Sequence, residues 1–364
     1  MSPMKITTTE CFHLKLTLSE SYDIAYESVD HCELLFLKIT TQEGKTGWGS
    51  AAPVTPVTGE SATGIMQSYR TVIEPILKGK GVFQYARIME RLKSTLPGKP
   101  SAMAMVDMAL YDLMAQKAGV PLYQLLGGYR NSIPTSITIG IMPTGEALRK
   151  AKKHVREGFH ILKIKGGKSL EEDISKIRMI RKAVGEKVKL RFDANQGYSQ
   201  EEALAFLKGT VEAGLELVEQ PTHKDELGLL KNITSKAQVN VMADESLISL
   251  NDAFVISKNK CSDLINIKLM KTGGILAATH ISSVAKAAGI RSMVGCMDES
   301  ALSISAGLHF ALSRPNIIYA DLDGHLDLLD DPFQGMVRIS RGKLIPSKAP
   351  GLGWTGTLKM QEGL

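Results

Sequence analysis

Several features that mark common classes of protein are missing from this chain of 364 residues. Its four cysteines are scattered and form no Cys-x-x-Cys pair, which argues against a disulfide scaffold and against a zinc site. No apolar run reaches about 18 residues, so we expect no transmembrane helix and no membrane partner. The opening stretch, MSPMKITTTE, is too polar for a signal peptide. We therefore predict a reduced, cytoplasmic protein.

Signatures of nucleic-acid and nucleotide binding are also missing. The net charge is +6, but lysines and arginines are interleaved with acids along the chain. The longest basic cluster, RKAKKHVR at residues 149–156, has helical spacing and no interleaved aromatic residues, so we interpret it as a solvated helix face. The segment KIKGGKS lacks the first glycine of a phosphate-binding P-loop. We expect no nucleic-acid partner.

The first third of the chain has an α+β pattern. Residues 5–18 alternate like a strand, and residues 33–53 have the pattern of a hairpin around a glycine-containing turn. The clearest helical pattern ends at Gly119. We predict an α+β capping domain over residues 1–128, with the tail at 332–364 packing back on it.

From residue 129 to residue 331, short apolar strands alternate with segments of helical length. We expect the strands at residues 135–141, 160–165, 188–193, 215–219, 238–244, 263–269, 291–296 and 316–323. Two of the intervening helices open with a Ser-x-x-Glu capping box, at Ser169 and Ser199. Eight strands separated by helices predict a (β/α)8-type, TIM-like barrel. A doubly wound open sheet is the alternative, but the first strand is not followed by a glycine-rich phosphate loop.

Charged side chains recur at the carboxyl ends of the predicted barrel strands. The ring consists of Lys165, Asp193, Glu219, Asp244, Lys268, Asp298 just beyond its strand, and Asp321. From Lys165, the first four steps are 28, 26, 25 and 24 residues (193−165, 219−193, 244−219 and 268−244), each about one strand–helix unit. Because barrel enzymes carry their chemistry on this face, the recurrence predicts an active site.

Three consecutive strands of this ring end in acids, Asp193, Glu219 and Asp244. Carboxylates that converge inside a barrel mouth repel one another unless a cation lies between them. Oxygen ligands without histidine or cysteine favour a hard ion, so we predict Mg²⁺, with Mn²⁺ as the alternative. Each acid alone could be a strand-end cap or a salt-bridge partner, but the even spacing favours a metal site.

Two lysines, Lys165 and Lys268, lie on the strands that flank the three acid strands. In a closed barrel they face each other across the predicted metal. A lysine near a divalent cation and another lysine should have a lowered pKa, so each could act as a general base near neutral pH. Two such bases could remove a proton from one face of a carbon and return it to the other. Simple salt bridges with the acids are the alternative.

The motifs that carry this ring resemble those of a known superfamily. They are KIK (163–165), DANQG (193–197), VEQP (218–221), ADES (243–246) and NIKLMKTGG (266–274). Over essentially the whole chain, the sequence is similar to the muconate lactonizing enzyme subgroup of the enolase superfamily. The resemblance implies lysine bases and Mg²⁺ acting on an enediolate.

Within the subgroup, GCMDES (295–300) and ADLDG (320–324) resemble dipeptide epimerases. The resemblance implies that Asp321 and Asp323 bind the free α-ammonium of a small dipeptide substrate. It also implies that Lys163 and Thr138 hold the substrate carboxylate. One of the two lysines of the ring would remove the α-proton of the second residue and the other would replace it from the opposite face. Without the resemblance, DLDG could equally be a turn.

The preferred side chain of the substrate is a separate question. Similar epimerases that act on Ala-Glu dipeptides have an arginine in the first capping loop, where this chain has Glu27. Asp298 adds a second acid at the barrel mouth. Acids repel an acidic side chain and attract a cationic one, so we hypothesise a preference for Lys or Arg dipeptides. The alternatives are L-Ala-D/L-Glu epimerase, N-succinylamino acid racemase, cycloisomerase and o-succinylbenzoate synthase activities.

Other classes of function fit the residues less well. A Schiff-base lysine enzyme does not need three converging acids. A non-enzymatic binding protein does not need the paired lysines. The sequence leaves homo-oligomerisation open.

Overall fold

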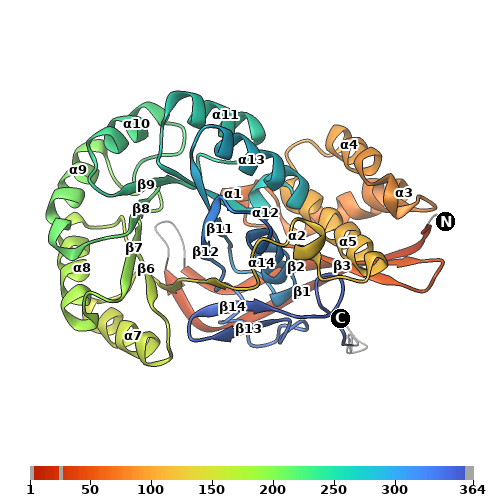
Figure 1. The fold of residues 1–364 in the computed structure, drawn as a ribbon, viewed down its shortest axis with the longest axis horizontal. Helices are drawn as coiled ribbons and strands as arrows, with labels where there is room; N and C mark the ends of the chain where they lie inside the picture. Colours follow the sequence, from red (N-terminus) through yellow and green to blue (C-terminus); the bar gives the residue numbers. More distant parts are fainter. Residues whose placement is uncertain (1–3, 24–27, 357–364) are drawn as a thin grey trace.

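The computed structural model describes residues 4–23 and 28–356, and it begins with a three-stranded antiparallel sheet (Figure 1). The strands are β1 (Ile6–Asp23), β2 (Ser28–Thr41) and β3 (Thr46–Ala51), with β2 in the middle. The hairpin predicted for residues 33–53 is confirmed, because Leu35 pairs with Ala51 and Thr40 pairs with Thr46. Glu27 and its loop neighbours at 24–26 lie outside the described residues.

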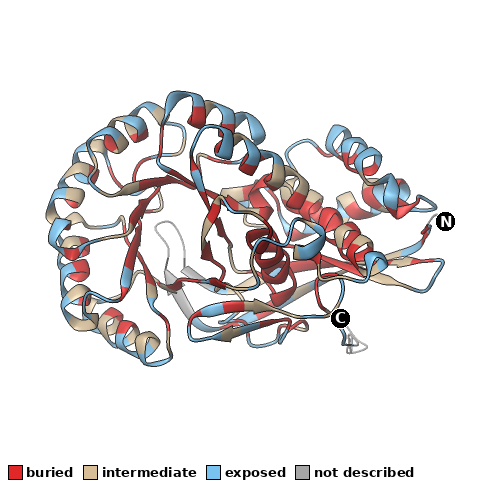
Figure 2. Cartoon of the chain, in the orientation of Figure 1, coloured by how far each residue is buried: buried red, intermediate tan, exposed pale blue. Residues whose placement is uncertain are grey.

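Helices complete the capping domain on one face of this sheet. They are α1 (Thr55–Thr58), α2 (Ala62–Ser68), the π-helix η1 (Tyr69–Ile73), α3 (Glu74–Leu77), the 3₁₀ helix η2 (Val82–Gln84), α4 (Tyr85–Thr95), α5 (Pro100–Ala118) and α6 (Leu122–Leu125). The central helix α5 lies directly on β3. This close approach is possible because Gly49 of β3 has no side chain. A β-carbon there would collide with the main-chain oxygen of Met105. Figure 2 shows most of α5 buried.

Eight parallel strands form the barrel, in sequence order around the sheet. They are β5 (Ile137–Ile139), β6 (Ile161–Lys165), β7 (Lys189–Asp193), β8 (Leu217–Glu219), β9 (Asn240–Ala243), β10 (Leu264–Lys268), β11 (Arg291–Gly295) and β12 (Ile317–Asp321). A parallel bridge between Thr135 and Ala320 links the first strand to the last. The predicted (β/α)8-type barrel with an α+β cap is confirmed.

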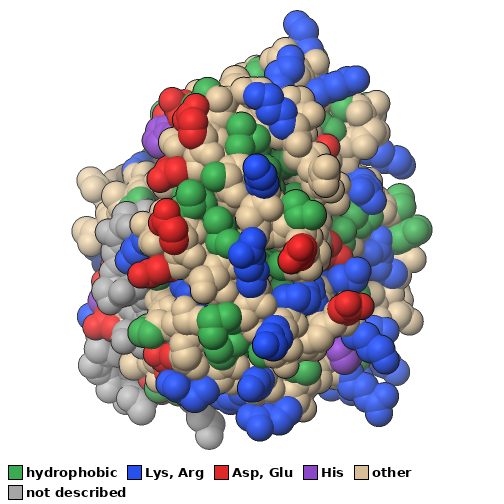
Figure 3. All heavy atoms as spheres, turned by 90° about the vertical axis from the view of Figure 1, so that its left-hand side faces the viewer, with side chains coloured by type: hydrophobic (Ala, Val, Ile, Leu, Met, Phe, Trp, Pro, Cys, Tyr) green, Lys and Arg blue, Asp and Glu red, His purple; other side chains and the backbone are tan. Residues whose placement is uncertain are grey.

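The barrel helices lie outside the strands (Figure 1). They are α7 (Thr144–Arg156), α8 (Leu170–Val184), α9 (Gln200–Gly209) with η3 (Val211–Ala213), α10 (Leu227–Lys236), α11 (Leu250–Asn259), α12 (Leu269–Thr272), α13 (Ile275–Ala287) and α14 (Ala301–Ser313). Figure 3 shows lysines and arginines spread over the α7–α9 side between acidic and apolar side chains. Among the described residues, no helix is long and apolar enough to cross a membrane.

After β12 the described chain forms no further barrel helix. Strands β13 (Val337–Ser340) and β14 (Lys343–Pro346) instead form a small sheet with β4 (Ile133–Pro134). The tail was expected to pack on the amino-terminal part, but this hairpin joins the strand that leads into the barrel. The later segment does reach the cap, because the main-chain N–H of Leu352 donates to Asp112 of α5 at 2.8 Å.

One of the two predicted capping boxes is wrong. Ser199 and Glu202 form theirs at the start of α9, but the side chain of Ser169 makes no capping hydrogen bond. The start of α8 is held by Asp173 instead. Its carboxylate accepts hydrogen bonds from the main-chain N–H of Gly167 and the Tyr198 hydroxyl, both at 2.8 Å.

The strand register places the predicted ring of charges at one level. Lys165 is the pairing partner of Asp193, and Asp193 is the partner of Glu219. On the other side of the barrel, Lys268 and Asp321 both pair with Gly295. Side chains from distant parts of the sequence therefore meet at the carboxyl end of the barrel, beneath the cap.

Candidate active site

A cavity of about 420 Å³ lies between the barrel mouth and the cap. Its barrel side is lined by Thr138, Lys163, Lys165, Asn195, Asp244, Glu245, Lys268, Asp298, Asp321 and Asp323. Its cap side includes residues at the end of β3 and in α1, from Ala52 to Val57, and acids of β1 and β2. The start of α1, at Thr55–Val57, therefore lies at the cavity.

Lys163 is the centre of the buried charge network. Its Nζ lies 2.8 Å from Asp321 Oδ2, 3.0 Å from Asp193 Oδ2 and 3.0 Å from Glu219 Oε2. Burial opposes its charge, but the surrounding acids outweigh burial and hold the pKa of Lys163 well above its usual value. Lys163 is therefore a fixed cation and not a proton acceptor.

Asp244 is held by two lysines. Lys268 Nζ lies 2.7 Å from Asp244 Oδ2, and Lys271 Nζ contacts Asp244 Oδ1 and the Asp244 carbonyl oxygen. Burial opposes ionisation, but the two lysines outweigh it and lower the pKa of Asp244. Burial lowers the pKa of Lys271, which is 1% exposed. Lys271 was not predicted from the sequence, although its position three residues after Lys268 could have placed it on the same side of the barrel.

The two candidate bases differ in their surroundings. Lys268 was expected to have a lowered pKa, but its pKa is raised because Asp244, Glu219 and Glu245 outweigh burial. A cation that shared the charge of Asp244 would weaken this effect. Lys165 is half-buried, lines the same cavity and has no ion pair with any residue of the described ranges. Both side chains therefore reach the cavity, from opposite sides of the acid cluster.

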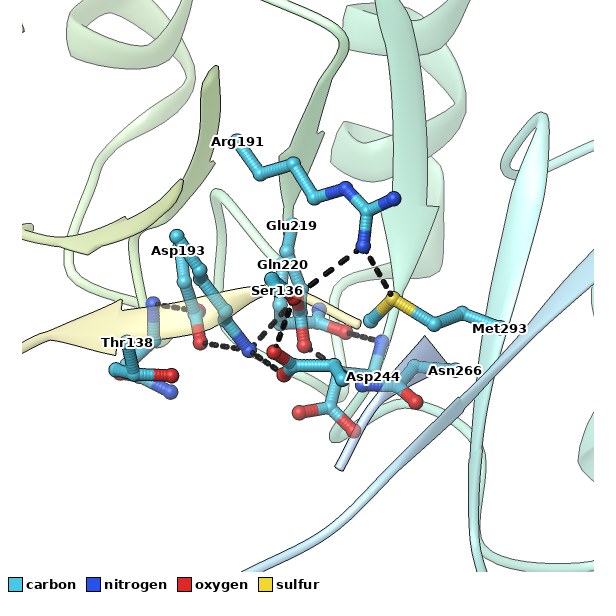
Figure 4. A network of polar contacts seen from close by, with 12 residues as sticks. Ser136, Thr138, Arg191, Asp193, Glu219, Gln220, Asp244, Asn266 and Met293 are labelled. Carbon is cyan, nitrogen blue, oxygen red and sulfur yellow. Dashed lines mark hydrogen bonds and ion pairs between the residues drawn. The ribbon is translucent and has the colours of Figure 1, made fainter. Parts of the chain in front are cut away.

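Each of the three clustered acids has one oxygen that accepts a hydrogen bond and one that does not. The accepting oxygens are Asp193 Oδ1, bonded to Asn195 N at 3.0 Å, Glu219 Oε1, bonded to Asn266 Nδ2 at 2.8 Å, and Asp244 Oδ1, bonded to Lys271. The other three oxygens, Asp193 Oδ2, Glu219 Oε2 and Asp244 Oδ2, are buried and face the ammonium groups of Lys163 and Lys268 in ion pairs. Figure 4 shows the three side chains converging from neighbouring strands.

This donor set fits a hard divalent ion such as Mg²⁺. Three converging carboxylates without nitrogen or sulfur ligands are the chemistry that Mg²⁺ prefers. The lysines do not fully offset the negative charge of the acids. Burial and Asp193 raise the pKa of Glu219 to about 8. Burial and Asp244 raise the pKa of Glu245 to about 7. The acids are arranged around ammonium groups, and in this arrangement no three acid, histidine or cysteine side chains of the described residues are placed so that they could hold a metal ion together.

The predicted substrate-binding residues meet on the other side of Lys163. The Ser136 hydroxyl donates to Asp321 Oδ1 at 2.5 Å, and the Thr138 main-chain N–H donates to Asp323 Oδ2 at 2.6 Å. Lys163 and Ser136 lower the pKa of Asp321 against the effect of burial. Burial and the neighbouring Asp321 raise the pKa of Asp323 to about 7. Both acids line the cavity, but Asp321 already pairs with a cation of the chain.

Beneath this cluster lies a buried arginine that the sequence analysis missed. Arg191 is 1% exposed, and its guanidinium donates to Glu216 at 2.8 Å and to Ser136 Oγ at 3.3 Å. It also donates to the Ala320 carbonyl oxygen at 3.2 Å and lies over the Tyr319 ring. Figure 4 shows Arg191 reaching across the barrel interior. Arg191 could have been predicted from the sequence as a site residue, because it is a charged residue in an apolar strand, two residues before Asp193.

The outer rim of the cavity, to which both the cap and the barrel contribute, is acidic. Its acids are Glu20, Asp30, Glu33, Asp298 and Asp327, and its basic residues are Lys150 and His31. Lys150 Nζ lies 2.5 Å from Glu20, and His31 contacts Asp30. Asp298, which was predicted at the barrel mouth, lines the cavity together with acids that were not predicted from the sequence.

Two family models match this chain. Residues 6–127 match "Mandelate racemase / muconate lactonizing enzyme, N-terminal domain", and residues 146–358 match "Enolase C-terminal domain-like". Together they cover both the cap and the barrel.

Several characterised proteins are similar over nearly their whole length. The L-Ala-D/L-Glu epimerase of Bacillus subtilis is 42% identical over 97% of both chains, and its substrate-liganded structure superposes with a TM-score of 0.94 over 96% of this chain and 98% of that one. The hydrophobic dipeptide epimerase of Enterococcus faecalis is 39% identical over 96% of this chain and 99% of its own. Its structure with Mg and L-Leu-L-Tyr has a TM-score of 0.94 and covers 96% of this chain and 99% of that one. The L-Lys-D/L-Arg epimerase of Desulforapulum autotrophicum is 40% identical over 96% of this chain and 99% of its own.

Proposed function

The chain belongs to the enolase superfamily, and from that premise we propose that it is a dipeptide epimerase, an Mg²⁺-dependent isomerase that inverts the α-carbon of the second residue of a dipeptide. The observation that carries this proposal is the placement of Lys165 and Lys268. They reach one cavity from the two strands that flank the three acid strands. Inversion needs a proton acceptor and a proton donor on opposite faces of one carbon, and this placement supplies both.

The residues around the bases would hold the substrate. Asp193, Glu219 and Asp244 would bind Mg²⁺, which supplies positive charge to the substrate carboxylate as negative charge develops on its oxygens. Lys163 adds a second fixed positive charge beside that site. Asp321 and Asp323 would receive the free α-ammonium. Because the pKa of Asp323 is raised by burial and by Asp321, an arriving ammonium would stabilise its ionised form.

Two different protons move, one at each lysine. In one direction, neutral Lys165 removes the α-proton while protonated Lys268 delivers a proton to the opposite face, and the reverse reaction exchanges their roles. Asp244 raises the pKa of Lys268, and this effect must weaken before Lys268 can accept a proton. A cation bound to Asp244 would share its negative charge and so lower the pKa of Lys268. Asn195, which donates to Glu245 at 3.2 Å and caps Asp193 through its main chain, keeps the acid cluster in place.

The acidic rim supports a preference for dipeptides with a cationic side chain. Five acids face the cavity there against one lysine and one histidine. A lysine or arginine side chain would be attracted to this rim, and a glutamate would be repelled. The alternative, L-Ala-D/L-Glu epimerisation, is supported by the Bacillus subtilis relative at 42% identity. The substrates of N-succinylamino acid racemase and cycloisomerase activities bring no free α-ammonium to Asp321 and Asp323.

The test compares three substrates with Mg²⁺ present. We expect inversion of L-Ala-L-Lys and of L-Ala-L-Glu, with kcat/KM about tenfold higher for the lysine dipeptide, and no inversion of N-succinyl-L-lysine, measured by ¹H NMR. Faster turnover of L-Ala-L-Glu would contradict only the cationic preference. Inversion of N-succinyl-L-lysine alone would contradict the dipeptide epimerase itself.

A further inference from the structure

Gln220 follows the metal-site acid Glu219 directly, and every polar group of Gln220 has a partner. Its Oε1 accepts hydrogen bonds from the main-chain N–H groups of Asp244 at 2.9 Å and Ser246 at 3.2 Å. Its Nε2 donates to the Thr222 carbonyl oxygen at 3.0 Å and to Ser246 Oγ at 2.9 Å. The side chain is 0% exposed. One glutamine thus joins the end of β8 to the segment that begins at Asp244.

The main chain of Gln220 joins the same strands. Its N–H donates to the Met242 carbonyl oxygen of β9 at 2.8 Å, and its carbonyl oxygen accepts from the N–H of Gln196, beyond β7, at 2.8 Å. Gln220 has a φ of 33°, and Asn195 and Gln196 have φ values of 42° and 69°. Residues with side chains rarely adopt this left-handed conformation, so it persists only where surrounding contacts enforce it.

We infer that Gln220 is a positioning residue that fixes Glu219 and Asp244 relative to each other, and thereby sets the affinity of the site for Mg²⁺. Mg²⁺ demands a near-ideal arrangement of its oxygen ligands, so a small shift between two of them weakens binding. Gln220 is covalently attached to the first acid and hydrogen-bonded to the main chain of the second. It does not contact the substrate cavity, so its effect is on the acids alone.

This inference rests on the metal site of the proposed function, and its test does not use epimerase activity. Mg²⁺ affinity is measured by isothermal titration calorimetry on the full chain after removal of divalent ions, with folding followed by circular dichroism. Gln220→Met keeps the length of the side chain and removes both polar atoms. Gln196→Ala is the matched control, because that glutamine also accepts a main-chain N–H, at 3.0 Å, but from Lys224, which is not a ligand.

We expect Gln220→Met to weaken Mg²⁺ binding by about 10- to 100-fold, the usual effect of removing a group that orients a metal ligand. Ser246→Ala removes only one of the four hydrogen bonds that the Gln220 side chain makes, and we expect it to weaken Mg²⁺ binding less than about threefold. Gln196→Ala should keep the wild-type affinity. Equal affinity in wild type and Gln220→Met, or an equal loss in Gln196→Ala, would overturn the inference.

If Gln220→Met does not fold, Gln220→Asn gives the decision. Its amide is one methylene too short to reach Asp244 N, so we expect the affinity to fall by at least about tenfold. An affinity within twofold of wild type would overturn the inference. If the wild-type protein itself binds no Mg²⁺, the proposed function fails instead, which separates the two claims.

Discussion

The charged residues at the barrel mouth are buried and paired, whereas those at the outer rim of the cavity are mostly exposed. At the mouth, Lys163 is 3% exposed and meets three acids within 3.0 Å. At the rim, Asp30 has a side chain that is 77% exposed and contacts only the neighbouring His31 among the described residues. The mouth is a buried network in which each group fixes several others, whereas the rim is a set of exposed acids.

This difference separates chemistry from selection. Interactions in a buried network are screened little by salt, and removing one member leaves others uncompensated. Exposed charges act weakly and at longer range, and salt screens them. We therefore expect changes at the mouth to decide whether the reaction occurs, and changes at the rim to decide which dipeptide is used fastest.

Removal of divalent ions should have the largest effect. The carboxylates of Asp193, Glu219 and Asp244 would lose the Mg²⁺ that we propose they bind, and only lysine ammonium groups would face them. We expect EDTA to reduce epimerisation below detection and added Mg²⁺ to restore it, measured by ¹H NMR. Full activity after exhaustive chelation would mean that the mouth works without a metal.

Replacement of one base comes next. Lys165→Ala removes a proton acceptor at the mouth, and we expect kcat to fall by about 10²- to 10⁴-fold, as for loss of a general base. Lys168→Ala is the matched control, because this lysine follows the same strand but is exposed and does not line the cavity. Equal activities for the two variants would remove the distinction between mouth and surface.

Neutralising the rim should have a smaller, selective effect. In Asp30→Asn/Glu33→Gln, we expect kcat/KM for L-Ala-L-Lys to fall about two- to tenfold and to lose much of its dependence on salt. The control is Glu10→Gln, an exposed acid of the same sheet that pairs with Lys38 away from the cavity. An equal fall for L-Ala-L-Glu would show that the rim acts on catalysis and not on side-chain selection.

A change at the interface between cap and barrel should affect the stability of the fold more than the activity. His309 of α14 accepts a hydrogen bond from the Tyr123 N–H of α6 at 3.0 Å, and burial lowers its pKa from 6.5 to about 4. The folded state therefore favours neutral His309. Its contribution to stability is present above about pH 6.5 and is lost as the pH falls through 4, a change on the order of 3 kcal/mol.

The matched variant is His309→Gln, which can accept the same hydrogen bond without titrating. We expect the free energy of unfolding of the wild type, from urea titrations at pH 7 and pH 4.5, to fall more steeply with acid than that of the variant. Carboxyl groups with a raised pKa, such as Asp107 with a pKa of about 7, make the folded state more stable as the pH falls. They do so equally in the wild type and the variant, so their effect cancels in the comparison. Parallel pH dependences would exclude His309 as the source.

Much of the fold could be predicted from the sequence, because barrel strands repeat a local pattern. Each strand is a short apolar run, and the spacing of the charged residues after them matches one strand–helix unit. Parallel pairing then places those residues at one level, as Lys165 beside Asp193 and Asp193 beside Glu219 show. The capping box at Ser169 failed because a competing acid, Asp173, holds the same turn from a position that only the tertiary structure reveals.

The partners of the site residues could not be predicted from the sequence. Lys271 and Asn266 each orient one oxygen of an acid, but nothing local says which acid they reach. The raised pKa of Lys268 depends on a distance to Asp244 that the strand pattern does not give. Glu27 lies outside the described residues, so its part in selection stays a prediction.

The central claim is that two lysines exchange the α-proton of the second residue with solvent. The most direct measurement is incubation of L-Ala-L-Lys with the Mg²⁺-loaded protein in D₂O, followed by ¹H NMR of that α-proton. We predict that the signal disappears at least as fast as the centre inverts, and that the loss is strongly reduced in Lys165→Ala and in Lys268→Ala. Inversion with retention of the proton, or undiminished exchange in both variants, would contradict the account.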